Sequence, residues 1–326
     1  MKFNNINHII VLGGSVISLS FLKFLKNSKI NYHFFTNKRM LDDKISNNRS
    51  LREHLKLNKI NYTSTQNINT NKKIKTILSA KTLGIGFGQP WVIKNNLLKK
   101  FDKRIVDFMG IPMPKYRGGA HYSWMILNDE KEGGCYIQNI NEKTIQGSND
   151  SGFYYLGLKY KYPKNLKIPK DFFNFSQKKE MNFLKSFIKK VNKNQNFVLK
   201  KLNEQQSIFF PRLNNSLNGF IDWDNTAEEI VKFINAFSDP YLGAITYINN
   251  KKIYLKNASL VAHNNYHTFS AGLILNKYKK DLIVAAKKGI VKINYIKNID
   301  MQNIKIGDRF MTERKLIEKS KKHFKI

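Results

Sequence analysis

In the first 140 residues of this chain, short apolar runs alternate with amphipathic segments. This pattern is the feature that most constrains the fold. Residues 8–12 read as a buried parallel strand, and they are followed by Gly13-Gly14-Ser15 and by apolar residues at helical spacing. Residues 32–36 read as the next strand. Strands that alternate with helices form a mostly parallel sheet with helices on both faces, and ligands gather at the carboxyl ends of its strands. The pattern predicts a Rossmann-like α/β fold.

Four further strands are predicted, at residues 75–79, 83–87, 104–108 and 135–140. The turn Gly13-Gly14-Ser15 offers amides at a helix N-terminus, which suits an anion, but it lacks the full Gly-x-Gly-x-x-Gly pattern. A tight turn that needs glycine is therefore the favoured interpretation. Residues 171–205 are rich in lysine and have apolar residues at helical spacing, which predicts a long helix with one solvated face.

The last third of the chain has a different pattern. Residues 214–219 read as a loop, and Thr226 with Glu229 three positions later forms a capping box that opens a helix ending near Phe237. Short β-rich runs follow at residues 243–248, 252–255, 282–286 and 290–296. We therefore expect an α/β domain at residues 1–208 and a smaller, barrel-like (OB-like) β-rich domain at residues 209–326.

Composition narrows the functional classes. The chain has 326 residues and a net charge of +34, but most of its basic residues are lysines spread along the whole length, whereas a nucleic-acid-binding face would cluster them with arginine and aromatic residues. The single cysteine, Cys135, excludes an intramolecular disulfide and a cysteine-rich zinc site, and no metal site is predicted. There is no signal peptide pattern and no apolar run long enough to span a bilayer. We expect a cytoplasmic protein and regard nucleic acid as an unfavoured partner.

Residues 107–119 read Asp-Phe-Met-Gly-Ile-Pro-Met-Pro-Lys-Tyr-Arg-Gly-Gly. This segment resembles the active-site loop of the folate-dependent formyltransferases, in which an Asn-x-His pair ends a strand and a Pro-Ser-Leu-Leu-Pro-x-Tyr-Arg-Gly turn leads into a helix. Alignment on Pro114 places Asp107 at the family's Asn and Met109 at its His. Other segments resemble the family in the same order between about residues 80 and 310: residues 87–90, 118–128, 149–152, 209–212, 221–223, 233–237 and 240–244.

The resemblance implies a reaction and a set of site residues. The reaction is transfer of a formyl group from 10-formyltetrahydrofolate, the co-substrate, to an amine, and a nucleotide-linked amino sugar is the favoured acceptor because residues 40–57 lack the basic Gly-Arg-Gly-Lys-Lys-type loop expected for a tRNA substrate. A homodimer is compatible with the resemblance. The residues it implies are Asp107 and Asp150 for catalysis, Phe87, Gly88, Gln89 and Asn149 for folate binding, and Tyr116 and Arg117 for substrate binding.

The exchanged residues change the expected chemistry. Asp107 can donate a hydrogen bond as an Asn amide does only if it is protonated, which requires burial or a nearby carboxylate such as Asp150. Met109 cannot replace a histidine in acid–base work, because a thioether is uncharged and only a weak acceptor. His121 lies just past the loop and is the candidate for that work, although a helix-start residue that bonds a local carbonyl is the favoured interpretation. Arg117 suits either an anionic ligand group or the carbonyls of its own loop.

Two other functions remain open on the sequence. Met109 also fits a catalytically silent member of the family that binds folate or substrate. The charge of +34 is the one independent argument for a methionyl-tRNA formyltransferase.

Overall fold

The computed structural model describes all residues of the chain except 4, 47, 142–149, 264, 323 and 325–326. Two compact units are present, and each is described separately. Unit 1 comprises Met1–Lys115, Gly133–Tyr160 and Ser176–Ser207, and unit 2 comprises Tyr116–Glu132, Lys161–Phe175 and Ile208–Ile326. Since the compact units are interleaved along the chain, the division into domains 1–208 and 209–326 stays a prediction.

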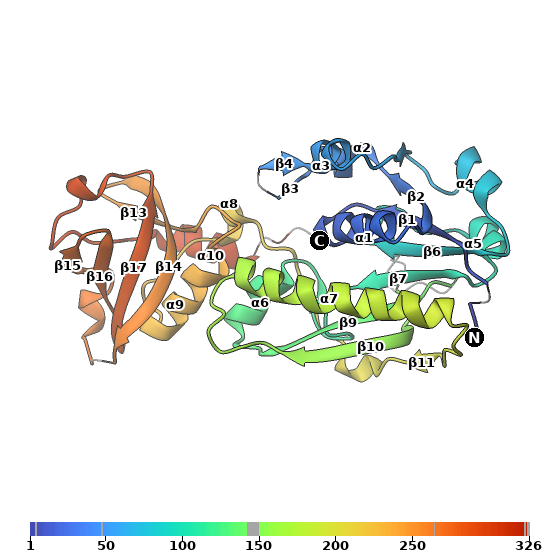
Figure 1. The fold of residues 1–326 in the computed structure, drawn as a ribbon. Coiled ribbons are helices and arrows are strands. Elements are labelled where there is room, and N and C mark those ends of the chain that lie inside the picture. The colour runs from blue at the N-terminus through green and yellow to red at the C-terminus, as the bar shows by residue number, and fades with distance from the viewer. Residues whose placement is uncertain (4, 47, 142–149, 264, 323, 325–326) are drawn as a thin grey trace. The chain divides into compact units, whose positions relative to one another are not determined.

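Unit 1 is built around an eight-stranded sheet of order β11-β10-β9-β7-β6-β1-β2-β5 (Figure 1). Five neighbouring strands are parallel, and β9 then pairs antiparallel with β7 and β11 antiparallel with β10. The sheet confirms the predicted Rossmann-like architecture. The strands are β1 (His8–Gly13), β2 (Asn31–Thr36), β5 (Thr63–Ser64), β6 (Thr82–Phe87), β7 (Ile105–Met109), β9 (Glu132–Asn139), β10 (Phe153–Lys161) and β11 (Lys200–Lys201).

Helices cover both faces of this sheet. One face carries Ile9 and Val11 and packs against α1 (Val16–Asn27), α3 (Leu51–Leu57) and the Phe183–Val191 part of α7 (Pro169–Asn192). On the other face, Ile10 and Leu12 pack against α4 (Lys72–Ile77) and α5 (Asn95–Phe101). Successive strand residues point to opposite faces, so a strand that is buried on both sides reads as a continuous apolar run.

The turn between β1 and α1 has the geometry of a tight glycine turn. Gly13 has φ +112°, and a side chain there would collide with the carbonyl oxygen of Phe87 in the neighbouring strand. Ser15 caps α1, and its backbone N–H donates to the Ser18 hydroxyl at 2.8 Å. The turn therefore confirms the interpretation that steric space, and not a dinucleotide fingerprint, requires the glycine.

Some predicted elements were wrong. Residues 75–79 were expected to form a strand, but α4 covers Lys72–Ile77, because the Asn71 side chain caps its first turn and only Ile74 of this helix is buried. The helix expected over residues 171–205 ends at Asn192 and is followed by β11 and η1 (Glu204–Gln206). The loop expected at residues 214–219 contains a short helix, α8 (Asn215–Asn218).

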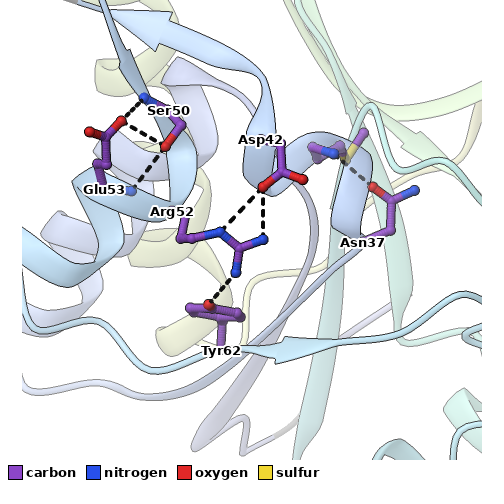
Figure 2. A network of polar contacts seen from close by, with 7 residues as sticks. Asn37, Asp42, Ser50, Arg52, Glu53 and Tyr62 are labelled. Carbon is purple, nitrogen blue, oxygen red and sulfur yellow. Dashed lines mark hydrogen bonds and ion pairs between the residues drawn. The ribbon is translucent and has the colours of Figure 1, made fainter.

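A polar network fixes the segment between β2 and β5 (Figure 2). The segment contains α2 (Lys38–Asp42), the hairpin of β3 (Lys44–Ser46) and β4 (Arg49–Ser50), and α3. Arg52 donates to Asp42 at 2.8 Å and to the Tyr62 hydroxyl at 3.2 Å. The helices begin at side-chain caps, Asn37 for α2 and a Ser50–Glu53 capping box for α3. Arg52, Asp42 and Glu53 therefore make polar contacts with other residues of the same segment.

Unit 2 contains a five-stranded antiparallel sheet of order β13-β14-β17-β16-β15. Its strands are β13 (Ala244–Ile248), β14 (Lys251–Ala262), β15 (Ile274–Tyr278), β16 (Asp281–Ala286) and β17 (Gly289–Lys297). Residues 309–311 bridge to Tyr247 of β13 and to Leu273 beside β15. Because the same segment touches both edge strands, the sheet is barrel-like, as predicted.

The remaining elements of unit 2 surround this sheet or precede it. Helix α9 (Ala227–Ala236) begins at the predicted Thr226–Glu229 capping box and packs on β14 and β17. The others are β8 (Arg117–Gly118), which pairs with β12 (Phe209–Phe210), α6 (His121–Leu127), α10 (Arg314–Lys322), η2 (Thr268–Ser270) and η3 (Met301–Asn303). Within the described part of the chain, none of the helices is both long enough and apolar enough to cross a bilayer.

Removal of the Thr226 cap should destabilise unit 2. In Thr226→Ala the N–H of Glu229 loses its acceptor, so the free energy of unfolding should fall by about 1 kcal/mol. Thr226→Ser keeps the hydroxyl and should stay within a few tenths of a kcal/mol of the parent. Urea unfolding of the three proteins measures the difference, and equal stability of all three would contradict the role of the cap.

Candidate functional site

Asp107 lies near the carboxyl end of β7, on the edge of the sheet where parallel strands present their ligands. Its side chain is 5% exposed and points to the same face as Met109. Gly86 is its partner in β6. A Cβ atom at Gly86 would lie 2.5 Å from Asp107 Oδ1 and would collide with Gln89 Oε1. Glycine at this position therefore leaves the space in which the Asp107 carboxyl and the Gln89 amide lie side by side.

Asp150 lies in the same unit and is 6% exposed. Its Oδ1 accepts hydrogen bonds from the Gln138 Nε2 amide at 3.1 Å and from the Gly152 backbone N–H at 2.9 Å. Gln138 is the partner of Asp107 in the β7–β9 ladder. The structure thus brings the two predicted catalytic carboxyl groups into one buried cluster, linked by a glutamine.

Several polar atoms of this cluster lack partners. Within the described part of the chain, Asp107 Oδ1, Gln138 Oε1 and both amide atoms of Gln89 are buried and make no hydrogen bond of acceptable geometry. A buried polar group without a partner costs about 1–3 kcal/mol, so such groups are usually paired in a folded protein. Four of them around one carboxyl indicate that this edge of the sheet is built to bind a polar ligand.

The electrostatics of the cluster favour a protonated Asp107. Burial is the main cause that raises the pKa of Asp107 to about 7; the nearby Asp150 charge acts in the same direction, whereas hydrogen bonds from the Gln89 amide and the Phe108 backbone N–H oppose the shift. A carboxyl group with this pKa is protonated in about half of the molecules at neutral pH. We expected Asp107 to act as a hydrogen-bond donor only if it is buried or lies near another carboxylate. The structure shows both features.

The predicted folate residues have different environments. Phe87 is a core residue: its ring is 2% exposed and lies 5.3 Å from the ring of Phe21 and 5.5 Å from that of Phe108. Only its backbone is available to a ligand at this edge. Gly88 is exposed and has φ +57°. Gln89 lies beside Asp107, as described above, and Asn149 is outside the described residues.

Three of the predicted site residues, Tyr116, Arg117 and His121, belong to unit 2, whereas Asp107 belongs to unit 1. That they form one site with Asp107 therefore stays a prediction. Tyr116 is 5% exposed, and its ring stacks on Phe210 at 5.0 Å. Arg117 is 8% exposed in β8, and its backbone N–H donates to the Ile208 carbonyl. The burial of Tyr116 against Phe210 gives this residue a packing role in its own unit.

His121 is the first residue of α6. Its Nε2 is buried and makes no hydrogen bond within the described part of the chain, and its ring lies 3.9 Å from the ring of Tyr122. Burial lowers the pKa of His121 to about 4. The imidazole is therefore neutral at pH 7 and has a nitrogen able to accept a proton, if Nδ1 carries the hydrogen.

Two buried polar residues were not selected by sequence reasoning. Gln138 has no recognisable signal, because a glutamine in an apolar strand gives no indication of its partner. Glu180 of α7 is 5% exposed, its carboxyl lies against Gly110, and burial raises its pKa to about 8. A lone glutamate in a lysine-rich helix reads as a surface residue, so its burial could not be predicted.

Cys135 is fully buried in β9, where burial and then Glu180 raise the pKa of its thiol. It is thus an inert core residue, as expected. Across the described residues, no group of three or more His, Cys, Asp or Glu side chains is arranged to hold a metal ion.

Comparison with known proteins gives the class of the chain. Residues 215–313 match the formyl transferase C-terminal domain. A stretch of 247 residues is 27% identical to the bifunctional polymyxin resistance protein ArnA of Wigglesworthia glossinidia brevipalpis, covering 72% of this chain and 34% of that longer protein. Another, of 239 residues, is 28% identical to the methionyl-tRNA formyltransferase of Lactococcus lactis subsp. cremoris and covers 68% of this chain and 67% of that one.

Solved structures share the fold. The sugar 3N-formyl transferase WlaRD, solved with dTDP and 5-N-formyl-THF, superposes with a TM-score of 0.65 at 19% identity over 91% of this chain and all of its own. The N-formyltransferase from Helicobacter canadensis, solved with folinic acid and dTDP-3-aminofucose, gives 0.62 at 19% identity over 89% and 98%. The chain thus shares its fold with these two solved N-formyltransferases. It is therefore similar to formyltransferases in sequence and in fold.

The raised pKa of Asp107 predicts how stability depends on pH. Between pH 4 and pH 7 the folded state holds a proton on Asp107 that the unfolded state releases, so the free energy of unfolding falls as pH rises through this window. Asp107→Asn removes this dependence. The variant should gain stability relative to the parent between pH 5 and pH 8, by up to about 4 kcal/mol, since one pKa unit corresponds to about 1.4 kcal/mol.

Urea unfolding at several pH values measures this difference. Glu180→Gln is the comparison variant, because burial also raises the pKa of Glu180, to about 8. Its gain in the free energy of unfolding over the parent should therefore continue to rise to a higher pH than that of Asp107→Asn. Parallel pH curves for Asp107→Asn and the parent would show that Asp107 titrates normally.

Proposed function

We propose that this protein transfers a formyl group from a folate donor, 10-formyltetrahydrofolate, to the amine of a nucleotide-linked amino sugar, and that protonated Asp107 supplies the hydrogen bond that stabilises the reacting oxygen. One observation above all supports the proposal: in a chain that is similar to formyltransferases, the residue in the catalytic loop that replaces an amide is a buried carboxyl group with a pKa of about 7. Its protonated form is a neutral donor of nearly the same shape as an asparagine amide.

The orphaned polar atoms around Asp107 fit a folate formyl donor. Such a molecule presents amide-like donors and acceptors, and the Gln89 amide and the carboxyl of Asp107 offer both kinds of partner. When an amine adds to the formyl carbon, negative charge develops on the formyl oxygen. A donor fixed in a buried site stabilises that charge strongly, and loss of one such donor typically costs about 10²–10³ in kcat.

Asp150 is suited to proton movement in this scheme. The attacking amine must lose a proton, and the folate nitrogen that leaves must gain one. The Asp150 carboxylate accepts the proton from the amine and returns it to the leaving nitrogen, so the protons balance over the cycle. Two hydrogen bonds to its Oδ1, from Gln138 and Gly152, hold the carboxylate in place.

We propose that His121 takes the extra proton of the ammonium form of the acceptor before the amine attacks and then releases it to solvent, since Met109 has no acid–base chemistry. A neutral imidazole with an unpartnered buried nitrogen supports that role. Tyr116 and Arg117 belong to the loop that precedes α6, and the Arg117 guanidinium suits a phosphate of the nucleotide sugar.

The favoured acceptor is a nucleotide-linked amino sugar. Solved relatives that share the fold were determined with dTDP or a dTDP-linked amino sugar. Residues 38–57 form two short helices and a hairpin, and their Arg52 is engaged by Asp42 and Tyr62 within the segment. Methionyl-tRNA is the second candidate, because methionyl-tRNA formyltransferases are among the sequence relatives at 21–28% identity.

One assay tests these alternatives together. The purified protein is incubated with 10-formyltetrahydrofolate and either a panel of nucleotide-linked amino sugars or methionyl-tRNA, while release of tetrahydrofolate is followed. Turnover with an amino sugar supports the proposal, and turnover with methionyl-tRNA alone would replace it by the second candidate. Folate binding by calorimetry without any turnover would indicate a silent binding protein.

The activity should depend on pH in the direction that Asp107 dictates. Because the protonated form is the donor, kcat should fall as pH rises above about 7. Asp107→Asn carries a donor that does not titrate, so it should remain active and lose this alkaline decline. Asp107→Leu should lose about 10²–10³ in kcat at every pH. A parent enzyme whose kcat rises from pH 7 to pH 9 would contradict the role of the protonated carboxyl.

His121→Ala should reduce kcat by about 10²–10⁴, the usual effect of the loss of an acid–base group. Met109→Ala is the matched control from the same loop region and should change kcat by less than about tenfold. Thermal unfolding of both variants separates a folding defect from a catalytic one. Full activity of a folded His121→Ala protein would remove His121 from the mechanism.

A further inference from the structure

We propose that Gln138 is a positioning residue of this site, whose amide bridges the two carboxyl groups and keeps their shared proton on Asp107 and off Asp150. The inference rests on the proposed function, in which protonated Asp107 is the hydrogen-bond donor. It assigns a task to a side chain that is fully buried and that no motif of the loop contains.

The Asp150 side of the bridge is directly visible. Gln138 Nε2 donates to Asp150 Oδ1 at 3.1 Å, and the Gly152 N–H donates to the same oxygen at 2.9 Å. Hydrogen bonds donated to a carboxylate favour its charged form. Two N–H donors therefore hold Asp150 Oδ1 as a hydrogen-bond acceptor.

The Asp107 side follows from the register of the sheet. Gln138 and Asp107 are direct partners in the antiparallel ladder of β7 and β9, so their side chains leave the same face with Cβ atoms about 4.5–5.5 Å apart. Gln138 Oε1 and Asp107 Oδ1 are both buried acceptors that have no donor within the described part of the chain. Two acceptors this close repel each other unless one carries a proton. Only the carboxyl can carry it.

A single orientation of the Gln138 amide serves both sides. With Nε2 directed to Asp150, Oε1 is left to accept from the carboxyl O–H of Asp107 in the free enzyme, which gives the order Asp107 O–H, Gln138 amide, Asp150 carboxylate. When the folate donor binds, the same O–H turns from Gln138 to the formyl oxygen. Gln89 also lies beside Asp107 and offers an alternative acceptor, but no hydrogen bond joins it to Asp150 in the described structure. Among the described side chains, Asp150 is also the one whose charge acts on Asp107. Gln138 is therefore the group that distinguishes the two carboxyls.

The test is a double-mutant cycle. Gln138→Met keeps the size of the side chain and removes both hydrogen-bonding atoms. In the parent it should lower kcat at pH 7 by about 10–100-fold and change the KM for folate by less than about threefold, because the fraction of molecules with the proton on Asp107 falls. In the Asp107→Asn background the donor is a fixed amide, so the same change should cost less than about threefold.

Tyr155→Phe is the matched control. It removes a buried hydrogen bond from the Tyr155 hydroxyl of β10 to Oδ1 of Asn139, the neighbour of Gln138 in β9, at 3.1 Å. The loss of kcat should be equally small in both backgrounds. If Gln138→Met lowers kcat equally in both backgrounds, Gln138 has only a structural role and the inference is wrong, while the proposed function stands.

Infrared spectroscopy detects the protonated carboxyl group without an activity assay. Glu180 is a second buried carboxyl with a raised pKa, so the comparison is made in a Glu180→Gln background. Near pH 6 this protein should show the carbonyl band of protonated Asp107, and the further change Asp107→Asn should remove it. Gln138→Met in the same Glu180→Gln background should shift the frequency of the Asp107 band, because the carboxyl O–H loses its acceptor. Absence of turnover and of folate binding in the parent would sink the proposed function, whereas an unchanged band in the folded Gln138→Met protein would sink the inference.

Discussion

The rest of the site depends on the burial of one carboxyl group, that of Asp107, next to another carboxyl group, that of Asp150. A charged carboxylate in a buried position is costly, and two are more so, so the pair keeps one proton near neutral pH. The neighbouring features accommodate this proton. Gly86 leaves the space for the carboxyl group, and Gln138 donates to Asp150 and is the partner of Asp107 in the ladder. In the proposed mechanism, the exchange of an amide for a carboxyl at position 107 is compensated by this buried environment.

Most of the fold could be predicted from local patterns. Strands such as β1 and β6 are buried on both faces, so they appear as unbroken apolar runs, and the Thr226–Glu229 capping box marks the start of α9. Residues 75–79 were predicted as a strand, but the Asn71 side chain caps the first turn of a helix that covers Lys72–Ile77. A short apolar segment is ambiguous in this way, because the contacts that select one conformation lie elsewhere in the chain.

The site was predictable only in part, and for a physical reason. The loop from Asp107 to Gly119 and the segment around Asp150 were identified by resemblance, and the need for a protonated Asp107 followed from the chemistry of the side chain. Two buried polar residues of unit 1, Gln138 and Glu180, gave no signal in the sequence. Gln138 acts across a ladder and Glu180 is buried by packing of α7, and neither relation depends on sequence spacing.

In the proposed mechanism, the difference between an amide and a protonated carboxyl at position 107 changes how activity depends on pH. An asparagine amide donates at any pH, whereas a carboxyl with a pKa of about 7 donates only while it holds its proton. Such a site is therefore coupled to pH in a way that an amide site is not, and the coupling has the opposite sign to that of a histidine base, which works better as pH rises. Replacement of the histidine position by Met109 is consistent with this reversal, because it removes the residue whose protonation would compete in the same pH range. The two exchanges in the loop can therefore be understood as one change in how the site holds its proton.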